Sequence, residues 1–146
     1  MKTMKRNQRP FYYCTIRKDS NGSAVTRVII DENGNETGQH IVLYNSPVRM
    51  KANVSPATGQ SMAEQFGNLE NYDKVIVTED LKCPIDENSV LFIDKEPEFT
   101  NVLTHDTTAV TVTEETVSVP AFDYIVRGVA KSLNSVSIAV RKVNVS

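Results

Sequence analysis

The chain has 146 residues, of which 40% are hydrophobic and 23% charged, and 16 lysines and arginines nearly balance 18 aspartates and glutamates. This length and composition fit one soluble globular domain and exclude a wholly disordered or fibrous chain. No apolar run approaches the roughly 18 residues of a membrane-spanning helix, and no apolar stretch of the secretory type follows the basic start. We therefore expect an intracellular or assembled protein without a membrane partner.

Branched side chains dominate the composition, with 19 valines, 9 isoleucines and 13 threonines against 6 leucines and 8 alanines. Valine, isoleucine and threonine lose rotamer freedom in helices and pack well on pleated sheets. The composition therefore predicts a chain that is mostly β.

Residues 1–9 contain four basic side chains and no acid, and we interpret them as a basic N-terminal arm. The next elements are two candidate strands, Phe11–Lys18 and Ala24–Ile30. Between them Asn21-Gly22 supplies the positive φ values of a tight turn, so we expect a hairpin. The basic side chains of the arm are Lys2, Lys5, Arg6 and Arg9.

Extended segments are expected at His40–Tyr44 and Val48–Val54, on either side of a proline-containing break. The pattern then changes at Ser55–Asn71, where Met62, Phe66 and Leu69 recur at helical spacing. Because Gly67 weakens helices, we interpret this segment as a long loop with one helical turn. Long loops inside compact domains are usually functional or disordered.

Strand character resumes at Asp73–Thr78, whose alternation puts Lys74, Ile76 and Thr78 on one face, and continues at Ser89–Ile93, a run suited to a buried strand. The stretch Pro97–Thr107 is less regular.

Two hairpins are expected toward the C-terminus. One pairs Ala109–Thr113 with Thr116–Val119 around a turn at Glu114-Glu115, and the other pairs Phe122–Ala130 with Val136–Val143. With about eight strands and at most one short helix, the fold class is a small all-β barrel or sandwich of about seven to nine strands, because a sheet must cover its apolar face. We expect residues 1–146 to form a single domain.

Catalytic and metal-binding patterns are missing from the sequence. Cys14 and Cys83 are isolated, which favours buried, reduced thiols, and His40 and His105 lack the spacing of metal ligands. No phosphate-binding loop, nucleophile elbow or dinucleotide fingerprint occurs. We therefore expect a non-enzymatic protein without a cofactor or metal.

The charges are unevenly placed along the chain. Acids predominate over residues 79–98, whereas residues 124–146 hold four basic residues and no acid. These regions are either ordinary solvated faces or patches that meet on neighbouring subunits. The basic arm could alternatively touch nucleic acid, although Phe11, Tyr12 and Tyr13 are the only aromatic cluster that could stack on bases, and we expect them to be core and interface residues.

Several segments, taken together, resemble the head-closure proteins (head–tail connector or stopper proteins) of long-tailed bacteriophages that infect Gram-positive hosts. The resemblance covers about residues 5–143 and contains no catalytic signature. Its segments are Val48–Ser55, Glu64–Gly67, Tyr72–Thr78, Cys83–Ser89 and Tyr124–Val136.

The resemblance implies a small β-barrel subunit of the virion neck, assembled in the host cytoplasm. Such a subunit forms a ring with copies of itself, below the portal and adaptor proteins, and closes the channel after the DNA is packaged. It also offers a surface to tail-completion or tail proteins. The long loop of that family matches Ser55–Asn71 here, and the contacts we expect from it toward a neighbouring subunit or the channel involve Ser55, Gln60, Met62, Glu64, Gln65, Phe66 and Leu69. For Met62 and Phe66 a place in the core of their own subunit is an equal alternative.

Two other classes of function stay open at this point. An OB-like barrel that binds single-stranded nucleic acid would use basic residues and the Phe11–Tyr13 cluster. A hydrolytic enzyme would need a pocket with perturbed titratable groups, which the sequence does not assemble.

Overall fold

The computed structural model describes residues 8–56, 72–106 and 113–143, and within them the chain is all β, with ten strands and no helix. The predicted fold class is therefore confirmed. The strands are β1 (Gln8–Cys14), β2 (Thr26–Ile30), β3 (Glu36–Val42), β4 (Val48–Pro56), β5 (Lys74–Thr78), β6 (Val90–Phe92), β7 (Phe99–Asp106), β8 (Thr113–Pro120), β9 (Tyr124–Lys131) and β10 (Val136–Lys142).

Contacts group the chain into two compact units, between which it passes at Thr15/Ile16, Ser46/Pro47, Pro97/Glu98 and Ala121/Phe122. The first unit contains β1, β4, β5, β6, β9 and β10, and the second contains β2, β3, β7 and β8. The single domain expected from the sequence stays a prediction.

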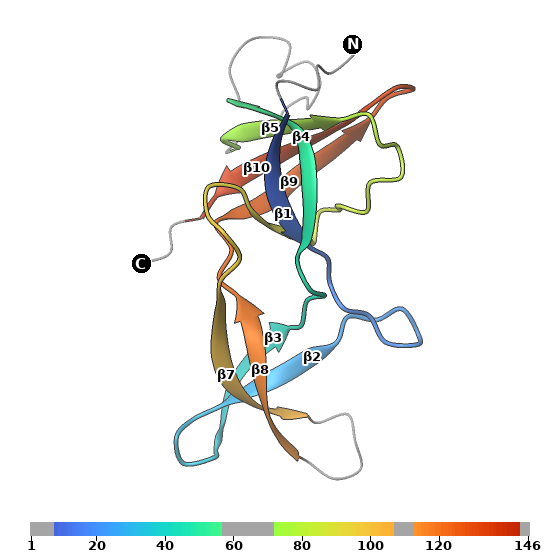
Figure 1. Ribbon diagram of the computed structural model, residues 1–146. Helices are drawn as coiled ribbons and strands as arrows, with labels where there is room; N and C mark the ends of the chain where they lie inside the picture. Colours follow the sequence, from blue (N-terminus) through green and yellow to red (C-terminus); the bar gives the residue numbers. More distant parts are fainter. Residues whose placement is uncertain (1–7, 57–71, 107–112, 144–146) are drawn as a thin grey trace. The chain divides into compact units, whose positions relative to one another are not determined.

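The first unit is a closed barrel with the strand order β1-β4-β5-β10-β9-β6. All its pairs are antiparallel, and Figure 1 shows β1 beside β4 and the long hairpin of β9 and β10. The short β6 completes the closure, because it pairs with β1 on one side and with β9 on the other. A closed barrel leaves no unpaired edge strand.

The interior of the barrel is filled by alternate side chains of its strands. Alternate residues of a strand point to the same face, so Phe11 and Tyr13 of β1 enter the core together with Ile76 of β5. The buried core cluster consists of Phe11, Tyr13, Ala52, Ile76, Cys83, Ile85, Leu91, Ile93, Tyr124, Val126, Val136, Ile138 and Val140.

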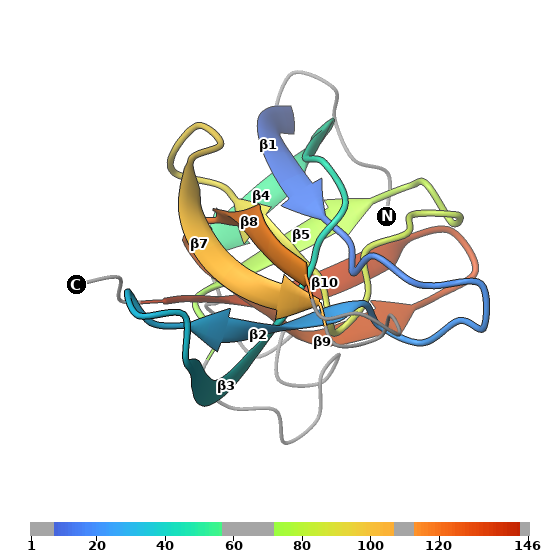
Figure 2. The ribbon, with the colours of Figure 1, turned by 90° about the horizontal axis from the view of Figure 1, so that it is seen from below.

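The second unit is an open four-stranded sheet with the order β3-β2-β7-β8, again antiparallel throughout. Figure 2 shows β7 and β8 as one long curved ladder, and β2 beside β3. Gly38 has a φ of +85°, which suits glycine, and the register between β2 and β3 shifts beside it.

The predicted hairpin between Phe11–Lys18 and Ala24–Ile30 forms only beside its turn, where Val25 N also donates to Arg17 O, and is wrong for the rest of the two segments. A turn does form, since Gly22 N donates to Asp19 O and a single bridge joins Lys18 to Ala24. Beyond this turn the two strands separate, because β1 pairs with β4 and β6 in the barrel whereas β2 pairs with β3 and β7.

The predicted turn at Glu114-Glu115 is also wrong. Both glutamates lie inside β8, which pairs along its whole length with β7. The stretch Pro97–Thr107, which is less regular in sequence, thus contains β7, the strand that pairs with β8. Cross-strand pairing can form a strand where the local sequence pattern is weak. Part of the expected strand Ala109–Thr113 lies outside the described residues.

The C-terminal hairpin is confirmed as β9 and β10, and the buried run at Ser89–Ile93 contains β6. The face assignment in β5 also holds, because Ile76 belongs to the barrel core. Cys14 and Cys83 are buried free thiols, as expected.

Removal of a leucine side chain from the barrel core should be far more costly than removal of one from the surface. Leu91 is fully buried, whereas Leu133 is 91% exposed. We expect Leu91→Ala to lower the free energy of unfolding by about 2–5 kcal/mol and the matched Leu133→Ala to change it by less than about 0.5 kcal/mol. Chemical denaturation of both variants measures this; equal losses would contradict the barrel core.

The thiols should react slowly in the folded protein. Burial raises the pKa of the Cys14 thiol to about 11, and burial is also the main cause that raises the pKa of the Cys83 thiol. Since only the thiolate is a good nucleophile, we expect colour development with a disulfide reagent at pH 8 to follow unfolding. Rapid modification of both cysteines without denaturant would contradict their placement.

Candidate functional site

At one end of the barrel, charged side chains take the inward-facing positions that apolar side chains occupy in the core. We call this region the charged end of the barrel. Arg9 lies two residues before Phe11 in β1, and Lys74 lies two residues before Ile76 in β5. Tyr124 is the first residue of β9. Because these strands run in the same direction, their first residues gather at one end of the barrel.

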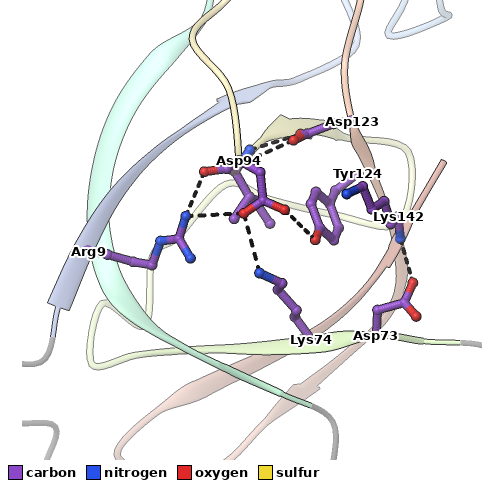
Figure 3. A network of polar contacts seen from close by, with 8 residues as sticks. Arg9, Asp73, Lys74, Asp94, Asp123, Tyr124 and Lys142 are labelled. Carbon is purple, nitrogen blue, oxygen red and sulfur yellow. Dashed lines mark hydrogen bonds and ion pairs between the residues drawn. The ribbon is translucent and has the colours of Figure 1, made fainter. Parts of the chain in front are cut away.

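Asp94 joins these three side chains (Figure 3). Tyr124 Oη donates to Asp94 Oδ2 at 2.8 Å. Arg9 Nη2 and Lys74 Nζ each lie 3.3 Å from Asp94 Oδ1, and Arg9 Nη2 also donates to Ile93 O at 2.9 Å. The carboxylate thus holds two cations and one phenol, which come from β1, β5 and β9.

A second layer of carboxylates fixes the backbone around this cluster. The buried Asp123 accepts hydrogen bonds from Ile93 N and Asp94 N, both at 2.9 Å. Asp73 Oδ2 accepts one from Lys142 N at 2.7 Å, as Figure 3 shows. Asp123 therefore positions Asp94, and Asp73 ties the start of β5 to the end of β10.

The electrostatics follow from these contacts. Partial burial opposes ionisation of Asp94, but the hydrogen bond from Tyr124 and the charge of Lys74 outweigh it, so the pKa of Asp94 lies below its ordinary value. Burial, followed by the hydrogen bond to Asp94, raises the pKa of Tyr124. A carboxylate of low pKa is a weak general base. The cluster therefore suits structural fixation of the barrel end better than proton transfer.

A pocket of about 280 Å³ adjoins the cluster on the first unit. Buried Phe11 and Phe92 lie beneath it, and polar side chains of both charges line it. The lining residues are Pro10, Phe11, Tyr12, Arg49, Phe92, Ile93, Asp94, Lys95 and Glu96.

The second unit has charged contacts of its own. His105 of β7 lies between Glu36 of β3 and Glu114 of β8, with its Nδ1 and Nε2 atoms 3.6 and 3.9 Å from the two carboxylates. Arg27 of β2 pairs with Glu115 at 3.3 Å and with Asp106 at 3.7 Å. These contacts connect all four strands of the sheet.

Two site residues named from the sequence lie in strands. Ser55 was expected to open the long loop, but it belongs to β4, where it pairs with Val75 of β5. Arg9 was expected in a free arm, but it belongs to β1 and is held by Ile93 and Asp94. In both cases pairing with a neighbouring strand makes the strand longer than the sequence suggested: β1 begins at Gln8 and β4 ends at Pro56.

The other predicted contact residues lie outside the described residues and stay predictions. They are Lys2, Lys5, Arg6, Gln60, Met62, Glu64, Gln65, Phe66 and Leu69.

The Asp94 cluster itself was missed in the sequence. Asp94 follows β6 in a turn-rich stretch, and nothing local marks it as a partner of Arg9, 85 residues away. The usable signal was the two-residue alternation, since Arg9 and Lys74 each continue an apolar row of their strand.

Metal binding and membrane insertion find no candidate in the part of the chain that the structure describes. No group of three or more histidine, cysteine or acidic side chains there is arranged to hold a metal ion. Nor does that part contain a helix whose length and hydropathy would carry it across a bilayer.

No model of a known protein family matches the chain, and neither a curated protein nor a solved structure is significantly similar to it.

The Asp94 cluster should make the stability of the barrel sensitive to acid. The folded pKa of Asp94 lies below the unfolded value of 3.8, so its contribution is complete above that value and is lost as the pH falls through the folded pKa. At pH 7 we expect Asp94→Asn to lower the free energy of unfolding by about 1 kcal/mol, because charge-assisted hydrogen bonds are lost at a partly solvated site.

The deficit of Asp94→Asn relative to the parent protein should shrink as the pH falls below 3.8 and on through the folded pKa of Asp94. Denaturation curves at pH 7, 5 and 3 and below measure it, with Glu87→Gln as the control, since Glu87 is an exposed carboxylate in the turn before β6. A deficit that is equally large at every pH would show that the charge of Asp94 contributes nothing.

Proposed function

We propose that this chain is a non-enzymatic structural protein of a bacteriophage neck. In this proposal copies of the chain form a ring between the portal and adaptor proteins and the tail. The ring closes the head after DNA packaging and provides the surface to which the tail attaches. Packaged DNA lies close to the ring in the channel, and the protein resides in the virion.

The observation that carries the proposal is the position of the segments that resemble head-closure proteins. Four of the five lie in the barrel unit, and the fifth, Glu64–Gly67, lies outside the described residues. The resemblance implies a small β-barrel subunit, and these segments supply three of the six strands of a closed barrel. They correspond to β4, β5, the turn before β6, and β9 with the loop that leads to β10.

The charged end of the barrel suits the base of a functional loop. Residues 57–71 connect β4 to β5, and Pro56 at the end of β4 pairs with Lys74 at the start of β5. Lys74 in turn binds Asp94. A segment that contacts a neighbouring subunit or narrows a channel needs rigid ends, because its function depends on where it is anchored.

Most of the aromatic surface that an OB-like barrel would need for stacking on bases is buried. Phe11 and Tyr13, which would stack on bases, belong to the buried core and are 1% and 9% exposed. Tyr12 is the member of this cluster that stays partly accessible. Single-strand binders stack successive bases on exposed aromatic rings, so this observation favours the structural role.

The proposal predicts association with the phage connector rather than with DNA. We expect the purified protein to co-sediment with a portal–adaptor complex encoded by the same genome, at low and at high salt, and to show no affinity for free single-stranded DNA. Sedimentation velocity with mass determination measures both. Phe66→Ser should weaken the association without loss of the folded state, which circular dichroism checks.

Two outcomes would contradict this function. One is tight, salt-dependent DNA binding without connector association, which would favour the nucleic-acid-binding barrel. The other is a Phe66→Ser protein that binds the connector as well as the parent protein does, which would remove the loop from the interface. Loss of folding in this variant would instead assign Phe66 to the core.

A further inference from the structure

The open sheet of the second unit has two edge strands, in contrast to the closed barrel. Among the described residues β3 pairs with β2 alone, and β8 pairs with β7 alone. An edge strand offers unpaired backbone N–H and C=O groups to another strand. The question is therefore which strand completes each edge.

β3 is an accessible edge with one irregular half. Residues 36–40 are exposed, and the strand contains neither lysine nor proline, which are the usual guards of an edge. Its first half bends at Gly38, where the register with β2 shifts. There Gln39 N donates to Thr37 Oγ1 at 3.3 Å. His40, Ile41 and Val42 pair regularly with β2 and keep the backbone extended. The second half of β3 is therefore the half suited to a new partner.

β8 has the opposite distribution. Its first half, from Thr113 to Thr116, is exposed and regularly paired with β7. It ends at Pro120, which has no N–H to donate to a further strand. The half of β8 suited to a new partner is thus its first half.

The directions of the strands bring the two suitable halves together. Neighbouring strands in this sheet are antiparallel, so β3 and β8 run in opposite directions. A copy of β3 placed outside β8, with the sheet continued, is antiparallel to it. The end of β3 then faces the start of β8, and the bent half of β3 faces Pro120.

The charges agree with this arrangement. Glu114 lies near the start of β8 and Glu36 at the start of β3. In the antiparallel arrangement Glu114, which also lies 3.9 Å from His105 of its own copy, comes close enough to the exposed His40 of the neighbouring copy to accept a hydrogen bond from its imidazole, whereas the two glutamates are kept at opposite ends. Antiparallel pairing of the second half of β3 with the same half of another β3 would place His40 beside Val42, without a carboxylate.

We propose that the end of β3 in one copy of the chain adds to the start of β8 in the next copy, as a fifth antiparallel strand. The contact is head-to-tail, because two different edges meet, and head-to-tail contacts generate rings when the rotation closes. The inference rests on the ring of the proposed function and identifies its subunit contact. The shared region is short, so we expect it to form mainly at high protein concentration or on the connector.

Paired cysteine variants of the full chain test the contact. His40→Cys and Thr116→Cys place thiols on β3 and β8, at exposed positions on the face that carries Val28 and His105. The native Cys14 and Cys83 are buried and compete little. The two variants carry tags of different mass and are mixed with a short flexible bis-maleimide. Thr100→Cys, an exposed position on the interior strand β7, replaces Thr116→Cys in the control mixture.

We expect the cross-linked heterodimer of His40→Cys with Thr116→Cys in about tenfold higher yield than the control, because docking raises the effective concentration of the two thiols. A His40→Cys homodimer as the main product would overturn the proposal in favour of a two-fold contact, and yields equal to the control would overturn it altogether.

A second pair of variants separates this contact from the proposed function. Thr116→Lys introduces an edge guard on β8, and Thr100→Lys places the same residue on an interior strand. We expect Thr116→Lys to melt like the parent protein and to bind the connector with fewer copies, and Thr100→Lys to leave the copy number unchanged. An unchanged copy number for Thr116→Lys would overturn the contact and leave the function standing. Specific cross-linking without any connector binding would overturn the function and leave the contact standing.

Discussion

Closure of the barrel through a three-residue strand is the constraint on which the rest of the first unit depends. β6 bridges β1 and β9, but its ladder ends at Phe92, close to the first residue of β9, while β1 continues to Gln8. Beyond that point side chains replace the missing backbone pairs. Arg9 donates to Ile93 O, and Asp123 accepts from the N–H groups of Ile93 and Asp94. Tyr124 donates to the carboxylate of Asp94. Side-chain hydrogen bonds of the polar cluster thus take the place of backbone pairing after β6, which explains why the cluster lies where β6 ends.

The sequence specified the strands better than it specified their partners. Branched residues and two-residue alternation correctly predicted an all-β chain, the C-terminal hairpin and the inward row of Ile76, because these features depend on local patterns. Pairing between distant segments leaves no local trace. The Asn21-Gly22 turn is real, yet its flanking strands belong to different sheets. Likewise Glu114-Glu115 resembled a turn because a solvated edge strand tolerates adjacent acids. Asp94 was invisible for the same reason, since its partners are brought in by the barrel.

The two units present different surfaces for assembly. The barrel satisfies its own backbone and directs its charges toward one another, so its contribution to the proposed function is a rigid frame for the connection between β4 and β5. The open sheet keeps edges, and these can be shared between copies. The two units thus differ in how they could contact another copy, because the barrel offers only side chains whereas the sheet also offers unpaired backbone groups.

The alternation of the two units along the chain also sets an order of folding during synthesis. All four strands of the open sheet have been made once Pro120 emerges, whereas the barrel still lacks β9 and β10. Until those strands arrive, β5 and β6 each lack a neighbour, and β1 must wait through more than half of the chain. The open sheet can therefore complete its pairing before the barrel does. Its bridge between Ile16 and Tyr44 already joins the chain that follows β1 to the chain that precedes β4, which shortens the loop between these two barrel strands before the barrel closes.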